Sequence, residues 1–493
     1  MNRRRVVRMI TGFMLLGLLF WTASCATNPV SGGPELMLLS EEDEIKLGGQ
    51  TDLEVRSQYG VFKDAELQAY LDDLCRRLGN LSHRPTLGYR LEILDASVVN
   101  AFAVPGGYVY FTRGILCTLN NEAELAGVMG HEIGHIAARH SAQQYSRAQL
   151  AQLGVVLGGL FMGDLGSGLA QFGVGMLFLS FSRDNERQAD ALGVEYSSKA
   201  GYDAAEMAHF FETLERMNPS SDRTGLPSWF STHPSPVDRE AAVRSMAKEW
   251  QQQLGLKHAK VNREVYLKKI DGLVYGEDPR QGYVEGGVFY HPDLRVQFPV
   301  PAKWKLANTP SMVQMASESK DAAIVFSMGE GTSPKEAAKN FVNKSGARLL
   351  SSDPVTVNGL SAHRLVSDIQ SQQGTVRVMS YFISKDKYVY VFHGLCTPSA
   401  YSQYDDVFDN TMKSFKNLSD PKKINVQPDR IRIRSVKSAD TVEDALRSMG
   451  VSRDELEQIA LLNGMELSDP VKTGTLLKVV DKPAKTASGI RFL

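Results

Sequence analysis

The pentapeptide HEIGH, residues 131 to 135, is the feature that most constrains how this chain can fold. In a helix of 3.6 residues per turn, His131 and His135 lie one turn apart on the same face, so both imidazoles can reach a single tetrahedral cation. Glu132 lies beside them, where its carboxylate can handle protons. The pattern predicts a helix that carries part of a metal site, and it requires another ligand from elsewhere in the chain.

The surrounding residues predict a helix independently of this motif. Asn121 followed by Glu124 resembles a capping pair, apolar residues recur on one face, and no proline interrupts residues 121–141. A bare HExxH is nevertheless short enough to occur by chance on a core helix. A metal site therefore needs support from the rest of the sequence.

A pair of acidic residues further along the chain supplies the missing ligand. Glu186 and Asp190 are four positions apart on a second predicted helix, in the segment FSRDNERQAD of residues 181–190. Glu186 would complete a set of two histidines and one carboxylate, which leaves one coordination position for water, as catalytic zinc requires. Asp190 could accept the free ring N–H of a liganding histidine. The alternative is a solvated helix face, which is typical of charged segments.

His140 competes with Glu186 as the third ligand, but its spacing argues against it. The metzincin pattern needs a glycine three residues after the second histidine and a histidine three residues beyond that. Ala138 and Ser141 occupy these positions. We therefore expect His140 to be structural or to contact a ligand rather than the metal.

These motifs resemble the HtpX, BepA and CAAX prenyl protease family of zinc metallopeptidases, the gluzincins, and within it the periplasmic BepA-like members. The resemblance covers about residues 36–270 and follows the family's order. Its motifs are NAFAVPGG at 100–107, EAEL at 122–125, HEIGH, Arg139-His140, the Glu186 and Asp190 pair, and His233-Pro234 with Arg239. It implies an endopeptidase with one Zn²⁺ per chain and a mainly helical catalytic domain.

The resemblance also implies roles for individual residues. The expected zinc ligands are His131, His135 and Glu186, and the expected general base is Glu132. His233 is expected close to the metal, where it either stabilises the transition state or caps the zinc in a closed form. Arg239 is expected to bind Glu186 or a substrate carbonyl.

An extended substrate is expected to pair with a strand of the catalytic domain. By resemblance, residues 100–110 form a strand edge beside the metal, and the substrate-binding residues are Asn100, Ala101, Phe102 and Ala103. The β-prone stretch from Tyr108 to Phe111 favours a strand here. An ordinary core strand is the alternative.

The N-terminus has the pattern of a signal peptide. Four arginines, at positions 3, 4, 5 and 8, precede an apolar run from Met9 to Trp21 that is too short for a typical membrane span. The following Thr22-Ala-Ser-Cys25 resembles a bacterial lipoprotein processing site, although Thr22 departs from the usual aliphatic residue. Residues 1–25 are thus expected to be a lipoprotein signal with Cys25 lipidated, and Ala26 is consistent with outer-membrane delivery. A conventional signal peptide is the alternative.

Composition indicates two or three globular domains and gives no sign of nucleic-acid binding, since 43% of the residues are hydrophobic, 23% are charged and the formal net charge is −1. The three remaining cysteines, Cys75, Cys117 and Cys396, form no disulfide framework. One bridge or free buried thiols both stay open.

The predicted fold class is α+β multidomain. A mainly helical metallopeptidase domain, residues 36–270, precedes an antiparallel-sheet α+β domain at 285–418 without recognisable chemistry. Residues 428–481 resemble a lysin motif, a small βααβ module that often binds peptidoglycan; glycan binding and a structural role stay open. The apolar stretch 150–181 predicts two short buried or lid helices, with membrane contact as the alternative.

Together these features predict a periplasmic zinc endopeptidase, lipid-anchored to the outer membrane. Its expected substrates, by resemblance, are unfolded, misassembled or stalled envelope proteins. The alternative is a non-catalytic scaffold or chaperone that holds client proteins or peptidoglycan. The presence of all three ligands together with Glu132 argues against the scaffold.

Overall fold

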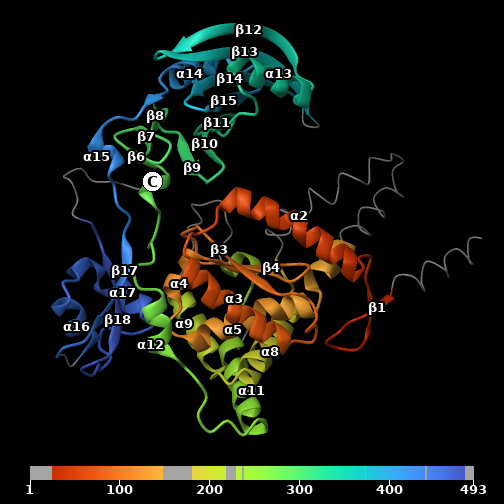
Figure 1. The fold of residues 1–493 in the computed structure, drawn as a ribbon, viewed down its shortest axis with the longest axis vertical. Helices are drawn as coiled ribbons and strands as arrows, with labels where there is room; N and C mark the ends of the chain where they lie inside the picture. Colours follow the sequence, from red (N-terminus) through yellow and green to blue (C-terminus); the bar gives the residue numbers. More distant parts are fainter. Residues whose placement is uncertain are drawn as a thin grey trace, which may run out of the picture.

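The computed structural model describes residues 25–147, 180–217, 229–235, 238–371, 374–438 and 441–483. The predicted signal segment before Cys25 and the predicted apolar helices at 150–179 lie outside these ranges. Within them, three parts follow one another from the N-terminus to the C-terminus (Figure 1). No helix in the described part of the chain has the length and apolar character needed to cross a membrane.

The first part is mainly helical and surrounds one small sheet. Its helices are α2 (Glu41–Tyr59), α3 (Ala65–Asn80), α4 (Arg113–Thr118), α5 (Glu122–Ala137), α8 (Arg183–Lys199), α9 (Glu206–Met217), α10 (Trp229–Thr232), α11 (Arg239–Gln253) and α12 (Arg263–Lys269). A short hairpin, β1 (Cys25–Thr27) with β2 (Pro34–Leu36), precedes them. The sheet has the order β3-β5-β4, formed by β3 (Arg90–Leu94), β4 (Ala101–Val104) and β5 (Tyr108–Thr112).

Polar caps start these helices at the expected places. The side chains of Ser40, Asp64 and Ser182 accept backbone N–H groups from the first turns of α2, α3 and α8. Asn121 likewise accepts the N–H of Glu124 at the start of α5. Each cap satisfies a backbone donor that the helix itself leaves without a partner. The start predicted at Asn121 for the helix that carries HEIGH is confirmed.

Helix α5 is buried along all 16 of its residues and packs closely against α8. A Cβ atom built on Gly130 would lie 3.0 Å from the carbonyl oxygen of Gly193, and one built on Gly193 would lie 2.9 Å from the backbone nitrogen of His131. The two backbones therefore touch without intervening side chains. This close approach brings the carboxylates of α8 to the histidines of α5.

Two details differ from the sequence-based expectations. Helix α5, which carries the HEIGH motif, ends at Ala137 rather than at residue 141. It ends there because Arg139 adopts a left-handed conformation with φ of 60°, and residues 140–147 then form a further helical segment. The expected edge strand at 100–110 is two strands, and only β4 lies at the edge. The other, β5, is the central strand, and all five of its residues are buried.

The middle part is an α+β unit with its own core. Seven antiparallel strands have the order β12-β13-β14-β15-β11-β10-β9, formed by β9 (Lys305–Asn308), β10 (Met312–Ala316), β11 (Ala322–Met328), β12 (Arg348–Val357), β13 (Leu360–Ser371), β14 (Gly374–Lys385) and β15 (Tyr388–Cys396). A smaller sheet contains β6 (Tyr283–Glu285), β7 (Val288–His291), β8 (Val296–Pro299) and β16 (Lys416–Asn417). Helices α13 (Pro334–Ser345) and α14 (Tyr401–Lys413) also belong to this unit, which agrees with the α+β class predicted for residues 285–418.

The last part has the order β-α-α-β. Strand β17 (Arg430–Ser435) pairs antiparallel with β18 (Leu476–Asp481), and helices α16 (Val442–Ser448) and α17 (Leu456–Leu462) lie between them in the sequence. Apolar side chains of this unit belong to the same hydrophobic core as the first part. In Figure 1 the unit lies beside α12, away from the middle part. The three cysteines Cys75, Cys117 and Cys396 are buried free thiols.

Candidate metal centre

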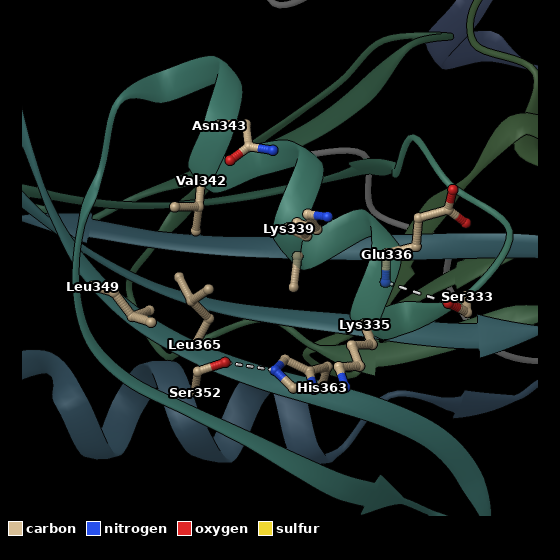
Figure 2. Close-up of a pocket in the computed structure, with 11 residues that line it drawn as sticks. Ser333, Lys335, Glu336, Lys339, Val342, Asn343, Leu349, Ser352, His363 and Leu365 are labelled. Atoms are coloured by element: carbon tan, nitrogen blue, oxygen red, sulfur yellow. Dashed lines mark hydrogen bonds between the residues drawn. The ribbon is translucent and has the colours of Figure 1, made fainter.

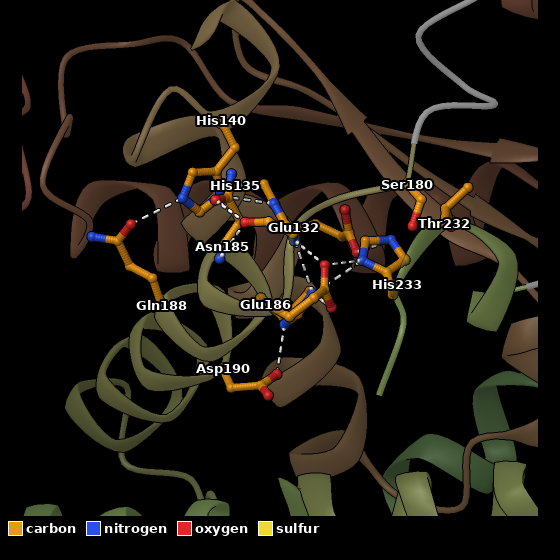
Figure 3. Close-up of polar contacts among 12 residues, drawn as sticks. Glu132, His135, His140, Ser180, Asn185, Glu186, Gln188, Asp190, Thr232 and His233 are labelled. Carbon is orange, nitrogen blue, oxygen red and sulfur yellow. Dashed lines mark hydrogen bonds and ion pairs between the residues drawn. The ribbon is translucent and has the colours of Figure 1, made fainter. Parts of the chain in front are cut away.

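Four buried side chains from three segments converge on one point. His131 and His135 come from α5, Glu186 from α8, and His233 from the residues just after α10. One nitrogen or oxygen atom of each lies within 4.8 Å of the corresponding atoms of the other three. Each of the four residues is at most 1% exposed. Figure 3 shows Glu186 and His233 pointing toward each other beside His135.

The distances between these atoms fit a tetrahedral metal. Ligands about 2.0–2.1 Å from a tetrahedral ion lie about 3.3–3.4 Å from one another. The two Nε2 atoms of His131 and His135 are 3.0 Å apart, and the Glu186 carboxylate lies 3.6 Å and 3.4 Å from them. Two imidazole nitrogens that face each other inside a protein need a shared cation or proton. The cluster therefore has the donor set and the spacing of a site for a divalent metal.

The outward nitrogen of His131 is held by a carboxylate. Its Nδ1–H donates to Asp190 Oδ1 over 2.9 Å, and Arg239 donates to the same oxygen over 2.7 Å and, over 3.4 Å, to Glu186 Oε2. The Arg239 guanidinium also lies on the ring of Phe211, 3.8 Å from its centroid. Of the two partners expected for Arg239, the Glu186 carboxylate is observed, and Asp190 is the nearer one. This arrangement keeps Nε2 of His131 free to face the centre.

The outward nitrogen of His135 is held by a second histidine. Nδ1 of His135 lies 2.9 Å from Nδ1 of His140, and Nε2 of His140 lies 2.9 Å from the Gln188 side-chain oxygen. Burial lowers the pKa of His140 to about 4, so its ring is neutral at physiological pH. A neutral His140 that donates to Gln188 must accept from His135, which leaves Nε2 of His135 directed at the centre. His140 thus contacts a ligand and is not itself in the cluster.

Glu132 is placed next to this cluster without joining it. Both carboxylate oxygens are buried and have no hydrogen-bond partner within the described ranges, and Oε1 lies 3.7 Å from Nε2 of His233. Burial raises the pKa of Glu132, opposed by the neighbouring histidines. Buried carboxylates are normally satisfied, so an unpartnered one at a cluster of histidines indicates a group that meets a water molecule or a substrate.

The pKa of Glu186 is shifted in the opposite direction from that of Glu132. Burial opposes its charged form, but the positive potential of His233 and the hydrogen bond that His233 Nδ1 makes to Glu186 Oε1 outweigh burial and hold the pKa of Glu186 well below its usual value. The carboxylate is therefore ionised, as a metal ligand must be. Burial also lowers the pKa of His135, which keeps a lone pair available on that ring.

His233 closes the fourth side of the cluster. Its Nδ1 lies 3.3 Å from Nε2 of His131 and 3.1 Å from Glu186 Oε1. The ring is stacked on Trp229 with centroids 4.2 Å apart, and the backbone N–H of Trp229 donates to the carbonyl of Val99. With His233 in this position, the cluster is complete and inaccessible to solvent.

Comparisons with known proteins agree with this geometry. Residues 63–247 match the family described as Peptidase family M48. The cluster, Glu132 and Asp190 all lie within that range. This range, called the M48 domain from here on, is thus similar to that peptidase family.

Three curated relatives of the M48 domain are similar in sequence. The putative beta-barrel assembly-enhancing protease of Vibrio cholerae is 29% identical over 43% of this chain and 46% of its own length. The beta-barrel assembly-enhancing protease of Escherichia coli is 29% identical over 46% of this chain and 48% of its own. The mitochondrial metalloendopeptidase OMA1 of Bos taurus is 25% identical over 48% of this chain and 49% of its own. The chain thus spans about half the length of the relatives it matches.

The residues predicted to bind substrate lie on the edge strand of the M48 domain. Strand β4 packs against α5, and its outer edge has no paired strand among the described residues. Asn100, Ala101 and Phe102 are nevertheless buried, and Phe102 stacks on Tyr110 with centroids 4.9 Å apart. Ala103 is half-buried. These residues border the metal helix, but they are not part of the cluster.

Three side chains of the M48 site were missed by the sequence analysis. Trp229 stacks on His233, Phe181 stacks on His135 with centroids 4.0 Å apart, and Gln188 orients His140. The spacing of four between Trp229 and His233 was the one local signal, because such a pair shares a helix face. Nothing local distinguishes Phe181 or Gln188, since each acts through a contact that only the fold creates.

A separate hollow of about 500 Å³ lies outside the M48 domain, between α13 and strands β12 and β13 (Figure 2). Its floor is largely apolar, with Leu349 and Leu365. Its two inner polar groups, Ser352 and His363, hydrogen-bond to each other over 2.7 Å. It contains no group of metal-binding residues among those described. Among the described residues, the metal centre is therefore the candidate for chemistry.

Proposed function

We propose that this chain is a zinc-dependent endopeptidase of the bacterial cell envelope that hydrolyses peptide bonds in misfolded or stalled envelope proteins. One observation carries the proposal: His131, His135 and Glu186 share one centre, and the unpartnered carboxylate of Glu132 lies beside it. In this proposal the first three bind one Zn²⁺ and Glu132 is the general base. Two imidazoles and one carboxylate at tetrahedral spacing favour zinc, as in other catalytic zinc sites.

The chain's own residues account for the hydrolytic steps. A bound zinc supplies a Lewis acid for the scissile carbonyl and lowers the pKa of a water molecule towards neutrality. Glu132 would take a proton from the attacking water and later deliver it to the leaving amine, so no covalent intermediate with the protein would be needed. Desolvation prepares Glu132 for this exchange, because burial raises the pKa of its carboxyl group.

The substrate is proposed to bind along β4. Its outer edge offers backbone groups to an extended chain, so affinity would depend little on side chains. The proposed substrate-binding residues are Asn100, Ala101, Phe102 and Ala103, and the backbone N–H and carbonyl of Asn100 themselves pair with Thr112. Such binding suits unfolded proteins, whose backbones are available over many sequences.

His233 is proposed to act as a cap, because it fills the position that a substrate or water would need. Replacing His233 by alanine is expected to raise the rate of cleavage of an unfolded protein several-fold to about tenfold, since a competent state that is sparsely populated limits the apparent rate. Zinc affinity should fall in the same variant, because one donor is lost. Initial rates at saturating zinc, together with calorimetric zinc titration, measure both effects. A variant with unchanged zinc affinity and no activity would instead assign His233 to the transition state.

Asp190 is proposed to orient His131. Replacing Asp190 by asparagine is expected to weaken zinc binding by about 10–100-fold, because the amide removes the charge that favours the ring N–H and leaves Arg239 without its nearer partner. Zinc titration with a competing chelator measures the change. Asp184 on the same helix is exposed, so Asp184→Asn is the matched control. Equal affinities in the two variants would contradict this role.

The cellular address is proposed from the N-terminal sequence and the relatives. Lipidation at Cys25 would anchor the chain to the outer membrane, facing the periplasm. Two relatives carry the name beta-barrel assembly-enhancing protease, which supports unfolded or misassembled envelope proteins as substrates. Radiolabelled fatty acid incorporated into the full chain but not into Cys25→Ser would test the anchor.

The remaining parts are proposed as accessory units. The proposed boundaries are 1–25 for the signal, 36–270 for the peptidase, 285–418 for the α+β unit and 428–481 for the lysin-motif-like module. Peptidoglycan binding by this module is proposed on its βααβ order and its motifs. Co-sedimentation of the full chain with purified peptidoglycan, and competition by soluble glycan fragments, would test it.

The test of the main proposal is cleavage of an unfolded protein by the full chain purified in detergent. Cleavage should require zinc, stop on addition of a chelator and return when zinc is restored. A chain that binds zinc and holds the unfolded protein but never cuts it would favour the alternative, a scaffold or chaperone.

A further inference from the structure

One lysine of the last strand is buried against the segment that precedes the metal-bearing helix. Lys478, on β18, is 0% exposed, and its ammonium donates to the backbone carbonyls of Cys117, Thr118 and Leu119 over 2.8, 3.1 and 3.0 Å. These carbonyls end helix α4, whose last turn has no intrahelical partners for them. A cation at a helix C-terminus is also favoured by the helix dipole. All three donors of this ammonium are therefore used on one turn of the M48 domain.

The same turn is held from its other side by Glu124 of α5 and Arg263 of α12. The backbone N–H of Asn120 donates to the Glu124 carboxylate over 2.7 Å, and Arg263 donates to the Asn120 carbonyl over 3.0 Å. Burial raises the pKa of Glu124 to about 7 and lowers the pKa of Lys478 to about 7. Each buried charge is thus costly alone and eased by the other. Residues 117–121 lie between a buried ammonium and a buried carboxylate.

Lys478 is itself fixed within the C-terminal unit. Its backbone N–H donates to the side chain of Asn463, whose amide donates back to the Lys478 carbonyl over 2.9 Å. The next residue, Gly464, packs so closely on the M48 domain that a Cβ atom would lie 3.1 Å from Asn120 and 3.3 Å from Thr213. The loop that fixes Lys478 therefore also contacts the cap of α5.

The C-terminal unit is joined to the first part along a second line of contact. Residues 272–275 exchange backbone hydrogen bonds with residues 429–431, and Arg430 donates to the Gly272 carbonyl over 2.7 Å. Side chains such as Ile431, Ile459 and Leu477 lie in the same apolar core as α5. A unit held by shared core, backbone pairing and a buried charge does not swing freely on a linker.

We infer that the C-terminal βααβ unit is a fixed clamp on the M48 domain, and that Lys478 is the positioning residue through which it sets the start of the metal-bearing helix. The mechanism is rigid-body: the ammonium fixes the turn 117–121, the turn fixes the cap at Asn121, and the cap fixes the axis along which His131 and His135 project. The unit then serves the metal centre from the far end of α5. This inference rests on the proposed function only in taking the cluster as the metal site.

The test replaces Lys478 by methionine in the full chain purified in detergent. Methionine has a similar length and no charge, so the three carbonyls lose the ammonium while the cavity stays filled, and the Thr118 carbonyl keeps only the Asn120 side-chain amide as a donor. Zinc affinity should weaken by about tenfold, as for residues that orient ligands indirectly. Amide hydrogen exchange, followed by mass spectrometry, should rise across residues 113–135 and stay unchanged in the middle α+β unit. Lys472, exposed in the same unit, gives the control Lys472→Met.

A double variant separates positioning from general loss of stability. Lys478→Met combined with Glu124→Gln removes both buried charges but still leaves the turn without the ammonium, so zinc affinity should stay about tenfold below that of Glu124→Gln alone. Recovery to the affinity of Glu124→Gln would assign the loss in the single variant to an unpaired charge and overturn the inference. Wild-type zinc affinity and exchange in the single variant would overturn the inference. If the single variant does not fold, the double variant is compared with Glu124→Gln alone. Faster exchange at 117–121 in the double variant then supports the clamp, and equal exchange there overturns it.

Failure of this inference is distinct from failure of the proposed function. Zinc binding and amide exchange need no turnover, so both are measured whether or not the chain cleaves protein. A zinc-loaded wild type without activity would contradict the proposed function but not the inference about the C-terminal unit. Normal activity with a Lys478→Met variant that matches the wild type in both readouts would end the clamp alone.

Discussion

Replacing Glu132 by glutamine is expected to lower the rate of peptide hydrolysis by about 10²–10⁴-fold, the range that general acid–base catalysis contributes. Glutamine keeps the shape of the side chain, but its amide cannot take a proton from water. The loss should appear in kcat, because Glu132 is not one of the proposed zinc ligands and its oxygens have no hydrogen-bond partner among the described residues. Zinc content should stay at one per chain.

The measurement is the initial rate of cleavage of an unfolded protein by zinc-loaded full chain, with metal content determined on the same sample. Glu212, partly exposed on α9 and paired with Arg244, provides the control Glu212→Gln, which should keep wild-type activity. Residual activity in Glu132→Gln within tenfold of the wild type would remove Glu132 from the mechanism and leave the water without an identified base.

Replacing Glu186 by glutamine is expected to abolish zinc binding at micromolar concentrations. The carboxylate is fully buried, lies 3.4 Å and 3.6 Å from the two histidine nitrogens, and is ionised, because the positive potential of His233 and hydrogen bonds outweigh burial in setting its pKa. A neutral amide is a weaker donor and leaves the guanidinium of Arg239 with one carboxylate instead of two. Activity should be lost together with the metal.

The same change should remove the stabilisation that zinc gives the M48 domain. A ligand at about 1,000 times its dissociation constant stabilises the folded state by about 4 kcal/mol, which glutamine at this position would forfeit. Calorimetric scans with and without zinc measure the shift of the transition that involves this domain. Glu195, on the same helix and paired with Lys199, gives the control Glu195→Gln, which should keep the zinc-dependent shift. A zinc-dependent shift of wild-type size in Glu186→Gln would exclude it as a ligand.

Local spacing was enough to predict much of this centre. HExxH and the Glu186 and Asp190 pair each depend on a separation of four residues, and a helix turns that separation into a shared face. The structure brings all of these residues together, with His131 bonded to Asp190. The helix starts were predictable for the same reason, since Ser40, Asp64 and Asn121 act on N–H groups only three residues away.

What sequence could not predict depends on contacts between distant residues. Helix α5 ends early because Arg139 is turned back to the Glu44 carboxylate and the Leu39 carbonyl, about a hundred positions before it. The prediction of an edge strand at residues 100–110 was only partly right. The strand order depends on which segment pairs with two neighbours, and here β5 pairs with both β3 and β4. Lys478 resembles any strand lysine until the fold places it on the carbonyls of residues 117–119.

The contact between Gly130 and Gly193 has a consequence for how accurately the ligands are placed. Where two helices meet through side chains, rotamer changes can absorb small shifts of one helix relative to the other. Where the backbones themselves touch, the distance between the helix axes is set by van der Waals contact and cannot become shorter. The distance from Glu186 to the two imidazoles therefore depends on this backbone contact and not on side-chain packing between the helices. Gly130 and Gly193 have no side chains and take no part in binding or proton transfer. They nevertheless limit how far Glu186 can shift relative to His131 and His135.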